Sequence, residues 1–272
     1  MTLAIAVQYP YGKLARAFHS LAQIRDIRYP EAIIFVSDSR WSYNNPIMYE
    51  DIGAKIWDIN NNTIVSYSGD VKVAELCIEE FKKKVNNPNV RSFSATGTFQ
   101  HIYKYHQKSD PSVKRLLLLL GSYLVNKGAR LVYLESPNFR PINITGVKGI
   151  GNKEAFNDVI KEVEPKINDP SLYTGTEKDY FTVAMYFVDA MRRLAVQNAD
   201  YKDIGGPIQC RILDCNGITT PSISFTSDPT GKTDEWHHAT VKSGEITTFR
   251  KRWNLKVNYL NSRSFGLYSY CD

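Results

Sequence analysis

The sequence predicts an α+β protein in which two antiparallel β-sheets pack face to face and a pair of helices covers each outer face. Two observations predict this fold class. Strand-like segments come in hairpins, and these are separated by pairs of amphipathic helices, in the order strands, two helices, strands, two helices, strands. Hairpins favour antiparallel pairing, and each helix pair needs an apolar sheet face on which to bury its stripe. A doubly wound parallel sheet is therefore disfavoured.

The first strands precede any strong helix. Residues 3–8 alternate between the two faces of a strand, and residues 32–42 (AIIFVSDSRWS) form an apolar, β-branched run that ends in polar residues. Residues 54–60 and 63–70 flank a turn of three asparagines and predict a hairpin.

Two helices are expected next. The spacing of apolar residues predicts a helix that starts at Asp70 and stops at Pro88. A second helix is expected within residues 94–107, before an Asp-Pro pair. Together they form the first helix pair.

The second half of the chain repeats this order. Residues 116–124 and 129–136 predict paired strands around an Asn-Lys-Gly turn. Two helices are expected at about residues 153–163 and 177–197. Two last strands follow, and a polar tail with strand-like pieces completes the chain; these strands are expected at residues 207–214 and 218–225.

The length and composition favour one large domain. The chain has 272 residues, of which 43% are hydrophobic and 23% are charged, enough for a single full core. We expect one domain over residues 1–272, with an insertion at residues 9–31 and a C-terminal extension from about residue 227. The formal net charge of +6 is spread along the chain, so solvated side chains account for it and no nucleic-acid partner is expected.

No targeting or membrane-spanning segment is expected. The N-terminal apolar run is short and has no basic region before it. The most apolar stretch, RLLLLLGSYLV at residues 115–125, suits a buried strand and is too short to cross a bilayer. We therefore expect a cytoplasmic protein with no membrane partner.

The cysteines and histidines predict neither a disulfide framework nor a metal site. The cysteines follow no CxxC spacing, so reduced and mostly buried thiols are expected. They are Cys77, Cys210, Cys215 and Cys271. His237 and His238 have no cysteine or histidine partner at ligand spacing, so we expect them in a surface loop or strand and predict no metal or other cofactor.

The insertion at residues 9–31 carries an amphipathic helical pattern. Its apolar residues recur at helical spacing, and three arginines give it a basic side. The apolar positions are Leu14, Phe18, Leu21 and Ile24, and the arginines are Arg16, Arg25 and Arg28. A cap over an active-site entrance, a subunit contact and a structural lid without a partner are all compatible with this pattern.

Four segments carry a resemblance to a known family. They are MTLAIAV at the N-terminus, FVSDSRWS, GAKIWDINNNTIVSYSGD and YKDIGGPIQCRILD. In this order they resemble the proteasome β-subunits and HslV-type threonine peptidases, members of the N-terminal nucleophile hydrolases. The resemblance implies a four-layer αββα sandwich and assembly of identical subunits into a ring.

The resemblance implies a catalytic residue in each segment. Thr2 matches the nucleophile that removal of Met1 would expose, and Asp38 and Lys55 match the acidic and basic residues beside it. Gly69, fourteen residues after Lys55, falls where the family has its oxyanion-hole glycine. The family's second aspartate corresponds to Asp200 or Asp203.

Three further residues match substrate-binding positions. Ser42 corresponds to a pocket-lining threonine, Tyr67 to the floor of the first specificity pocket, and Glu75 to a wall that would favour a basic side chain. Ordinary core or helix-surface packing explains Tyr67 and Glu75 equally well.

At two positions the sequence departs from the family pattern. Ile150 stands where the family has a catalytic serine within a Gly-Ser-Gly turn, and Ile204 stands where it has a serine before a Gly-Gly pair. These departures favour a catalytically inactive scaffold subunit as one alternative. A second alternative is an amidase that acts on a small nonpeptide amide.

The chemistry of the matched residues favours a hydrolase. A threonine hydroxyl needs a base beside it, and a free α-amino group, whose reference pKa is about 8, can act as that base within the same residue. We therefore expect Thr2 to cleave peptide bonds in a peptide or protein substrate, without a cofactor. An ATP-dependent unfoldase is a further partner that the resemblance implies.

Overall fold

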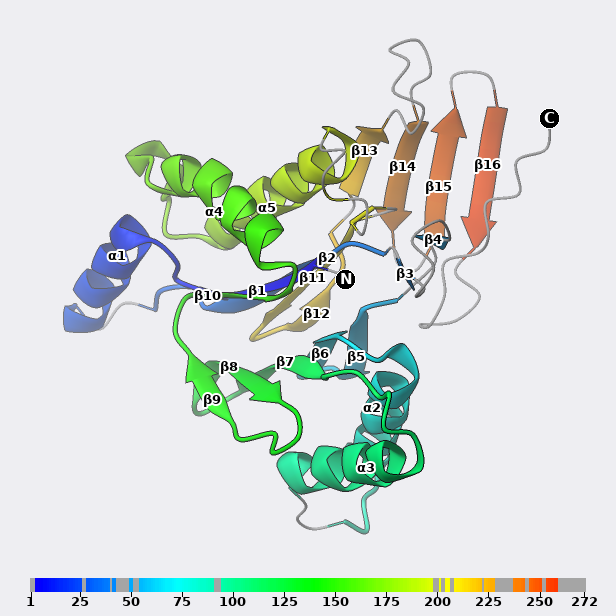
Figure 1. The fold of residues 1–272 in the computed structure, drawn as a ribbon. Helices are drawn as coiled ribbons and strands as arrows, with labels where there is room; N and C mark the ends of the chain where they lie inside the picture. The colour runs from blue at the N-terminus through cyan, green and yellow to red at the C-terminus, as the bar shows by residue number, and fades with distance from the viewer. Residues whose placement is uncertain are drawn as a thin grey trace.

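The computed structural model is an α+β protein with two five-stranded antiparallel sheets and, among the residues it describes, five α-helices (Figure 1). The described residues are 3–25, 28–39, 41–42, 49–50, 54–90, 94–197, 201, 204–205, 208–221, 223–227, 237–242, 245–250 and 253–258. None of the helices described is long and apolar enough to cross a membrane.

In the first sheet, the start of the first strand of the chain lies next to the end of the second strand of the chain. Its strands are, in spatial order, β10 (Val147–Gly151), β1 (Leu3–Tyr9), β2 (Ala32–Ser37), β11 (Gln209–Asp214) and β12 (Gly217–Thr219). All neighbours pair antiparallel, and Ala4 of β1 lies opposite Ser37 of β2. The residue after β2, Asp38, is therefore positioned beside the first residue of β1.

The second sheet is a meander in which each strand pairs with the next in the chain. It consists of β5 (Ile56–Asn60), β6 (Thr63–Ser68), β7 (Leu117–Leu124), β8 (Gly128–Glu135) and β9 (Ile142–Ile144). All four pairings are antiparallel, which confirms the two predicted hairpins. Short loops join β5 to β6, β7 to β8 and β8 to β9, as is usual for antiparallel neighbours, whereas two helices lie between β6 and β7 in the chain.

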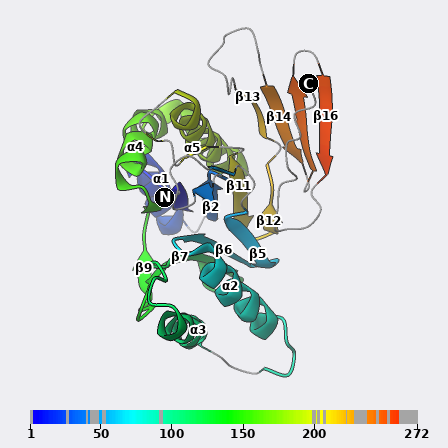
Figure 2. The ribbon, with the colours of Figure 1, turned by 45° about the vertical axis from the view of Figure 1, so that its right-hand side comes forward.

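A helix pair packs against each sheet (Figures 1 and 2). Helices α4 (Lys153–Ile167) and α5 (Glu177–Gln197) pack on the first sheet, and α2 (Val71–Val85) and α3 (Ala95–Ser109) pack on the second. The remaining helix, α1 (Lys13–Ile24), lies between β1 and β2 in the chain, within the predicted insertion. A short 3₁₀ helix, Pro170–Leu172, precedes α5.

Strand β2 shows how the core is divided. Ile34 and Val36 belong to the cluster shared with α4 and α5, whereas Ile33 and Phe35 belong to a cluster shared with the second sheet. Both faces of the strand are therefore covered, and all its residues are buried. This burial explains why the sequence of β2 is a continuous apolar run instead of an alternating one.

Side-chain caps set the starts of three helices. Asp70 accepts a hydrogen bond from the backbone N–H of Val73 (3.1 Å) at the start of α2, and Ser94 and Asn152 act in the same way for α3 and α4. Helix α4 continues to Ile167, beyond the predicted end at residue 163, although it contains Pro165. Burial of Ile167 favours this last turn.

Two predicted strands are shorter than expected. In residues 32–42, β2 ends at Ser37, and β3 (Trp41–Ser42) instead pairs with β4 (Tyr49–Glu50). The predicted strand at residues 218–225 is interrupted near Pro221, because a proline cannot donate a hydrogen bond to a neighbouring strand. The strands after this break form a separate four-stranded antiparallel sheet. They are β13 (Ile223–Ser227), β14 (His237–Lys242), β15 (Glu245–Arg250) and β16 (Trp253–Asn258).

Candidate active site

Asp38 holds the first described residue of the chain. Its carboxylate Oδ1 accepts a hydrogen bond from the backbone N–H of Leu3 (2.9 Å), and its own N–H donates to the Leu3 carbonyl oxygen (3.2 Å). Asp38 is fully buried. Leu3 is bonded to Thr2 in the chain, so the predicted acidic residue binds the peptide group that follows the predicted nucleophile.

Lys55 supplies the countercharge. Its ammonium Nζ lies 2.9 Å from the other carboxylate oxygen of Asp38, and both side chains are almost inaccessible to water. Two opposite charges at this distance in the interior attract strongly, but each also loses its hydration on burial. The structure thus brings together Asp38 and Lys55, two of the residues predicted from the sequence.

Gln209 fixes the backbone that carries Lys55. Its side-chain Oε1 accepts hydrogen bonds from the N–H groups of Lys55 (3.1 Å) and Ile56 (3.3 Å), which connects the start of β11 to the start of β5. The predictions missed Gln209. The only signal in the sequence is a polar residue within an apolar strand, and its spacing says nothing about Lys55.

Two buried serines flank Asp38 and were also missed. The Ser37 hydroxyl donates to the carbonyl oxygens of Leu3 (3.2 Å) and Asp38 (2.9 Å). The backbone N–H of Ser39 donates to the Gly205 carbonyl oxygen (3.2 Å), which brings the segment around the predicted Gly-Gly turn beside Asp38. The site therefore lies where the first sheet meets the start of β5.

Gly69 has a backbone conformation that favours glycine. Its φ is +122°, and a Cβ at this position would collide with the carbonyl oxygen of Arg115. Gly69 comes directly before Asp70, the cap of α2, so it lies at the positive end of a helix dipole. A backbone N–H at such a position suits an anion or an oxyanion.

The three predicted substrate-binding residues lie in different surroundings. Tyr67 is buried in the cluster between the second sheet and α2, and Glu75 is a half-buried residue on α2. Ser42 lies in β3, opposite Tyr49, and its side chain is outside the described part of the structure.

Thr2, Asp200 and Asp203 lie outside the described residues. Their described neighbours in the chain are Leu3, Tyr201 and Ile204.

The two isoleucines that replace family serines are core residues. Ile150 lies opposite Ala4 in the pairing of β10 with β1 and is buried between the two sheets. Ile204 is buried in the cluster beneath α4 and α5. Both side chains are held by apolar contacts, and neither brings a hydroxyl group to the site.

Two of the cysteines are poor nucleophiles. Burial raises the pKa of the Cys77 and Cys210 thiols to about 12, so both stay protonated at neutral pH. Cys215 is exposed at the turn before β12. Cys271 is outside the described residues.

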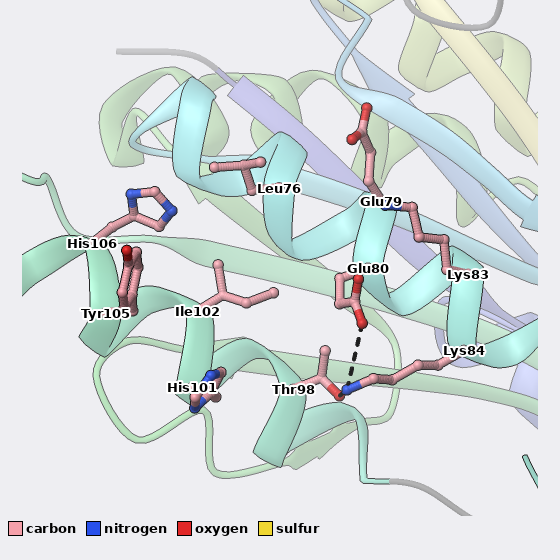
Figure 3. Close-up of a pocket in the computed structure, with 10 residues that line it drawn as sticks. All are labelled: Leu76, Glu79, Glu80, Lys83, Lys84, Thr98, His101, Ile102, Tyr105 and His106. Carbon is pink, nitrogen blue, oxygen red and sulfur yellow. Dashed lines mark hydrogen bonds and ion pairs between the residues drawn. The ribbon is translucent and has the colours of Figure 1, made fainter.

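A pocket of about 490 Å³ lies on the outer surface between α2 and α3 (Figure 3). It is lined by Leu76, Glu79, Glu80, Lys83, Lys84, Thr98, His101, Ile102, Tyr105 and His106. The Lys84 ammonium lies 3.7 Å from the Glu80 carboxylate and 3.3 Å from the Thr98 hydroxyl. None of the predicted site residues lines this pocket.

No group of three or more histidine, cysteine, aspartate or glutamate residues in the described part of the chain could hold a metal ion. No protein-family model matches the sequence, and no curated protein gives a significant match.

Proposed function

We propose that this protein is an N-terminal nucleophile hydrolase of the proteasome β-subunit and HslV type, which cleaves peptide bonds with Thr2 after removal of Met1. The observation that carries the proposal is the double contact of Asp38. This buried carboxylate binds the Leu3 N–H on one oxygen and the Lys55 ammonium on the other. A cation is thereby held beside the peptide group that joins Thr2 to Leu3.

The positions of the helices and sheets support this proposal. Each five-stranded sheet carries a helix pair, and a third apolar cluster lies between the sheets. We infer the αββα sandwich of the N-terminal nucleophile hydrolases from this arrangement. A fold alone does not define a function, so the argument depends on the site.

The first half-reaction needs a base and a cation. In the proposed reaction, the Thr2 Oγ attacks the substrate carbonyl carbon and gives its proton to the α-amino group of Thr2. The carbonyl π electrons move to the oxygen, and the Gly69 N–H stabilises the resulting oxyanion. Lys55 lowers the pKa of the hydroxyl through its positive charge, and Asp38 keeps Lys55 charged and in position.

The cycle then closes with water. The oxyanion re-forms the carbonyl, the C–N bond breaks, and the leaving nitrogen takes the proton from the α-ammonium group, which leaves an ester on Thr2. Water attacks this ester while giving a proton to the α-amino group. Collapse of the second intermediate releases the carboxylic acid and returns the proton to the Thr2 oxygen, so the net reaction is hydrolysis.

The proposal extends to assembly and location. Peptidases of this class degrade proteins within closed chambers, so a homo-oligomeric ring in the cytoplasm, fed by an ATP-dependent unfoldase, fits the proposed activity. Light scattering tests the assembly, and a monomeric mass at working concentration would contradict the ring.

The decisive experiment is intact mass spectrometry of the untagged protein before and after incubation with an epoxyketone, a reagent that needs both a free α-amine and a threonine hydroxyl. We expect a mass without Met1 and a single adduct, and Thr2→Ala should give no adduct. Fluorogenic peptides and small acyl amides then distinguish a peptidase from an amidase.

The buried isoleucines support a second candidate, a catalytically inactive scaffold subunit. Ile150 and Ile204 complete apolar clusters and supply no hydroxyl group. A scaffold would retain Met1, form no epoxyketone adduct and be indifferent to Thr2→Ala. The same mass measurement therefore separates the two candidates.

A further inference from the structure

Helix α1 packs on the protein with its small side chains and the half-buried Leu14, and leaves its other three large apolar side chains exposed. Ala15 and Ala22 are the buried residues of this helix. By contrast, Phe18 is 41% exposed, Leu21 is 51% exposed and Ile24 is 81% exposed. The amphipathic pattern of the sequence therefore corresponds to an outward-facing apolar stripe, the reverse of a helix that covers a core.

The contacts of α1 with the body hold this orientation. The His19 Nε2 lies 3.2 Å from Glu31 Oε1, and the Phe18 ring packs against the Tyr173 ring with 5.8 Å between centroids. The hydroxyl groups of Tyr9 and Tyr29 are 3.0 Å apart, next to His19. These contacts lie on both flanks of the buried alanine edge, so the stripe is a fixed surface.

A second exposed apolar point lies beside this helix. Val125, in the turn between β7 and β8, is 89% exposed, and Lys127 of the same turn is also exposed. The Glu31 carboxylate that contacts His19 also accepts a hydrogen bond from the backbone N–H of Ala129 (3.3 Å), just after this turn. The turn and α1 are therefore neighbours through Glu31.

The segment that carries the stripe has a net positive charge. Helix α1 contains no aspartate or glutamate, and residues 13–28 carry four cations and a single acidic residue. The cations are Lys13, Arg16, Arg25 and Arg28, and all four are exposed. A second copy of the chain placed face to face would bring this charge against itself, which is unfavourable. A negatively charged occupant is complementary.

We propose that α1 and the neighbouring β7–β8 turn form a docking surface for a bilayer of anionic phospholipid. A helix with exposed Phe and Leu side chains on one face and Arg and Lys side chains around it lies at the interface between headgroups and acyl chains. Leu21, Ile24 and Val125 insert, and the cations bind the headgroup phosphates. This surface would hold the protein at a membrane without a spanning helix, which departs from the sequence-based expectation of no membrane partner.

Co-sedimentation of the intact protein with vesicles tests this proposal. We expect binding to vesicles that contain phosphatidylserine, and binding weaker by about tenfold or more to vesicles of phosphatidylcholine alone. Added salt should weaken the binding, because headgroup attraction is screened within a Debye length.

Variants separate insertion from charge. Leu21→Ser/Ile24→Ser should abolish binding, and Arg16→Gln/Arg25→Gln should reduce it by about tenfold or more and weaken its salt dependence, since two of the four cations remain. Tyr105→Ser is the matched control, because Tyr105 is a large exposed side chain (65%) on α3, and its binding should equal that of the wild type. All these positions are exposed, so unchanged melting temperatures are expected.

Two results would contradict the proposed membrane docking. Failure of the wild type to bind phosphatidylserine vesicles would overturn the proposal, as would binding that survives Leu21→Ser/Ile24→Ser. A lower assembly mass in that variant, without vesicle binding by the wild type, would assign the stripe to a contact between copies. None of these results depends on Thr2 or on hydrolysis, so this test is independent of the proposed peptidase activity.

Discussion

Among the residues that the structure describes, Asp38 and Asp179 are completely buried, and their carboxylates are satisfied in opposite ways. Asp179, in the first turn of α5, accepts hydrogen bonds from the backbone and hydroxyl of Thr174 (2.9 and 2.6 Å) and from the backbone of Gly175 (2.8 Å). Asp38 binds Leu3 and Lys55, which lie 35 and 17 residues away in the chain.

The difference indicates different roles. Asp179 uses neutral donors from its own loop at a helix N-terminus, an arrangement that stabilises local structure. Asp38 instead keeps a second charge, Lys55, in the interior. Such a pair is poor evidence for stability, because apolar residues of similar volume often stabilise a core equally well. Under the proposed function, Asp38 and Lys55 serve chemistry, whereas Asp179 serves folding.

The largest expected effect is that of Lys55→Met. Removal of the ammonium leaves the Asp38 carboxylate buried and unpaired, which should lower the free energy of unfolding by about 3–5 kcal/mol and abolish hydrolysis. Urea denaturation and turnover of a fluorogenic peptide measure the two effects.

The double variant Asp38→Asn/Lys55→Met is the control for Lys55→Met. The asparagine side chain that replaces the aspartate can still accept the Leu3 hydrogen bond, and neither member of the charge pair remains. Most of the stability should return, whereas hydrolysis should not. An active double variant would contradict a chemical role for the pair.

A smaller effect is expected at the other aspartate. Asp179→Ala removes three hydrogen-bond acceptor contacts and should lower the free energy of unfolding by about 2 kcal/mol. Turnover per folded molecule should be unchanged, because the change is confined to the loop before α5. A loss of turnover in a folded Asp179→Ala protein would erase the distinction between the two aspartates.

Local patterns predicted most of the fold. The hairpin over residues 54–70 and the helix between Asp70 and Pro88 are determined by turn residues, caps and apolar spacing, which are readable from nearby sequence. The failures have tertiary causes. Helix α4 continues past its proline, and residues 218–225 divide between two sheets.

The site was only partly predictable for the same reason. The resemblance pointed to Asp38 and Lys55, and the structure places them in contact. Gln209 is 154 residues from Lys55, and only the pairing of β11 with β2 brings it there. A contact of that sequence separation leaves no periodic signal.

Gln209→Leu should moderately lower both the stability of the protein and its rate of hydrolysis. It removes the acceptor from two backbone N–H groups and should lower the free energy of unfolding by about 1–2 kcal/mol. Because Lys55 loses its backbone anchor, kcat should fall while KM stays unchanged.

Gln8→Leu is the matched control, since Gln8 also joins the two sheets, by donating to the Ala129 carbonyl oxygen (2.8 Å). Gln8→Leu should lower the free energy of unfolding and leave kcat unchanged. Equal effects of the two glutamine variants on kcat would show that Gln209 does not position Lys55.

The smallest expected effect is on the pH dependence of stability. It is absent at neutral pH and appears only at alkaline pH. Burial raises the pKa of Tyr173 to about 12, and the nearby Asp179 charge contributes to this rise; the pKa of Tyr9 is raised further, also mainly by burial. A folded pKa above the unfolded value near 10 means that stability is complete below about pH 10 and is lost as the pH rises toward 12.

Tyrosinate absorbance followed with circular dichroism should show these phenols ionising as the fold is lost. Asp179→Asn should move the ionisation of Tyr173 to lower pH, whereas Asp38→Asn/Lys55→Met, which should keep most of its stability, should leave it nearly unchanged, because of these two aspartates only Asp179 contributes to the rise. A shift of equal size in both variants would mean that the two aspartates do not act on separate regions of the protein.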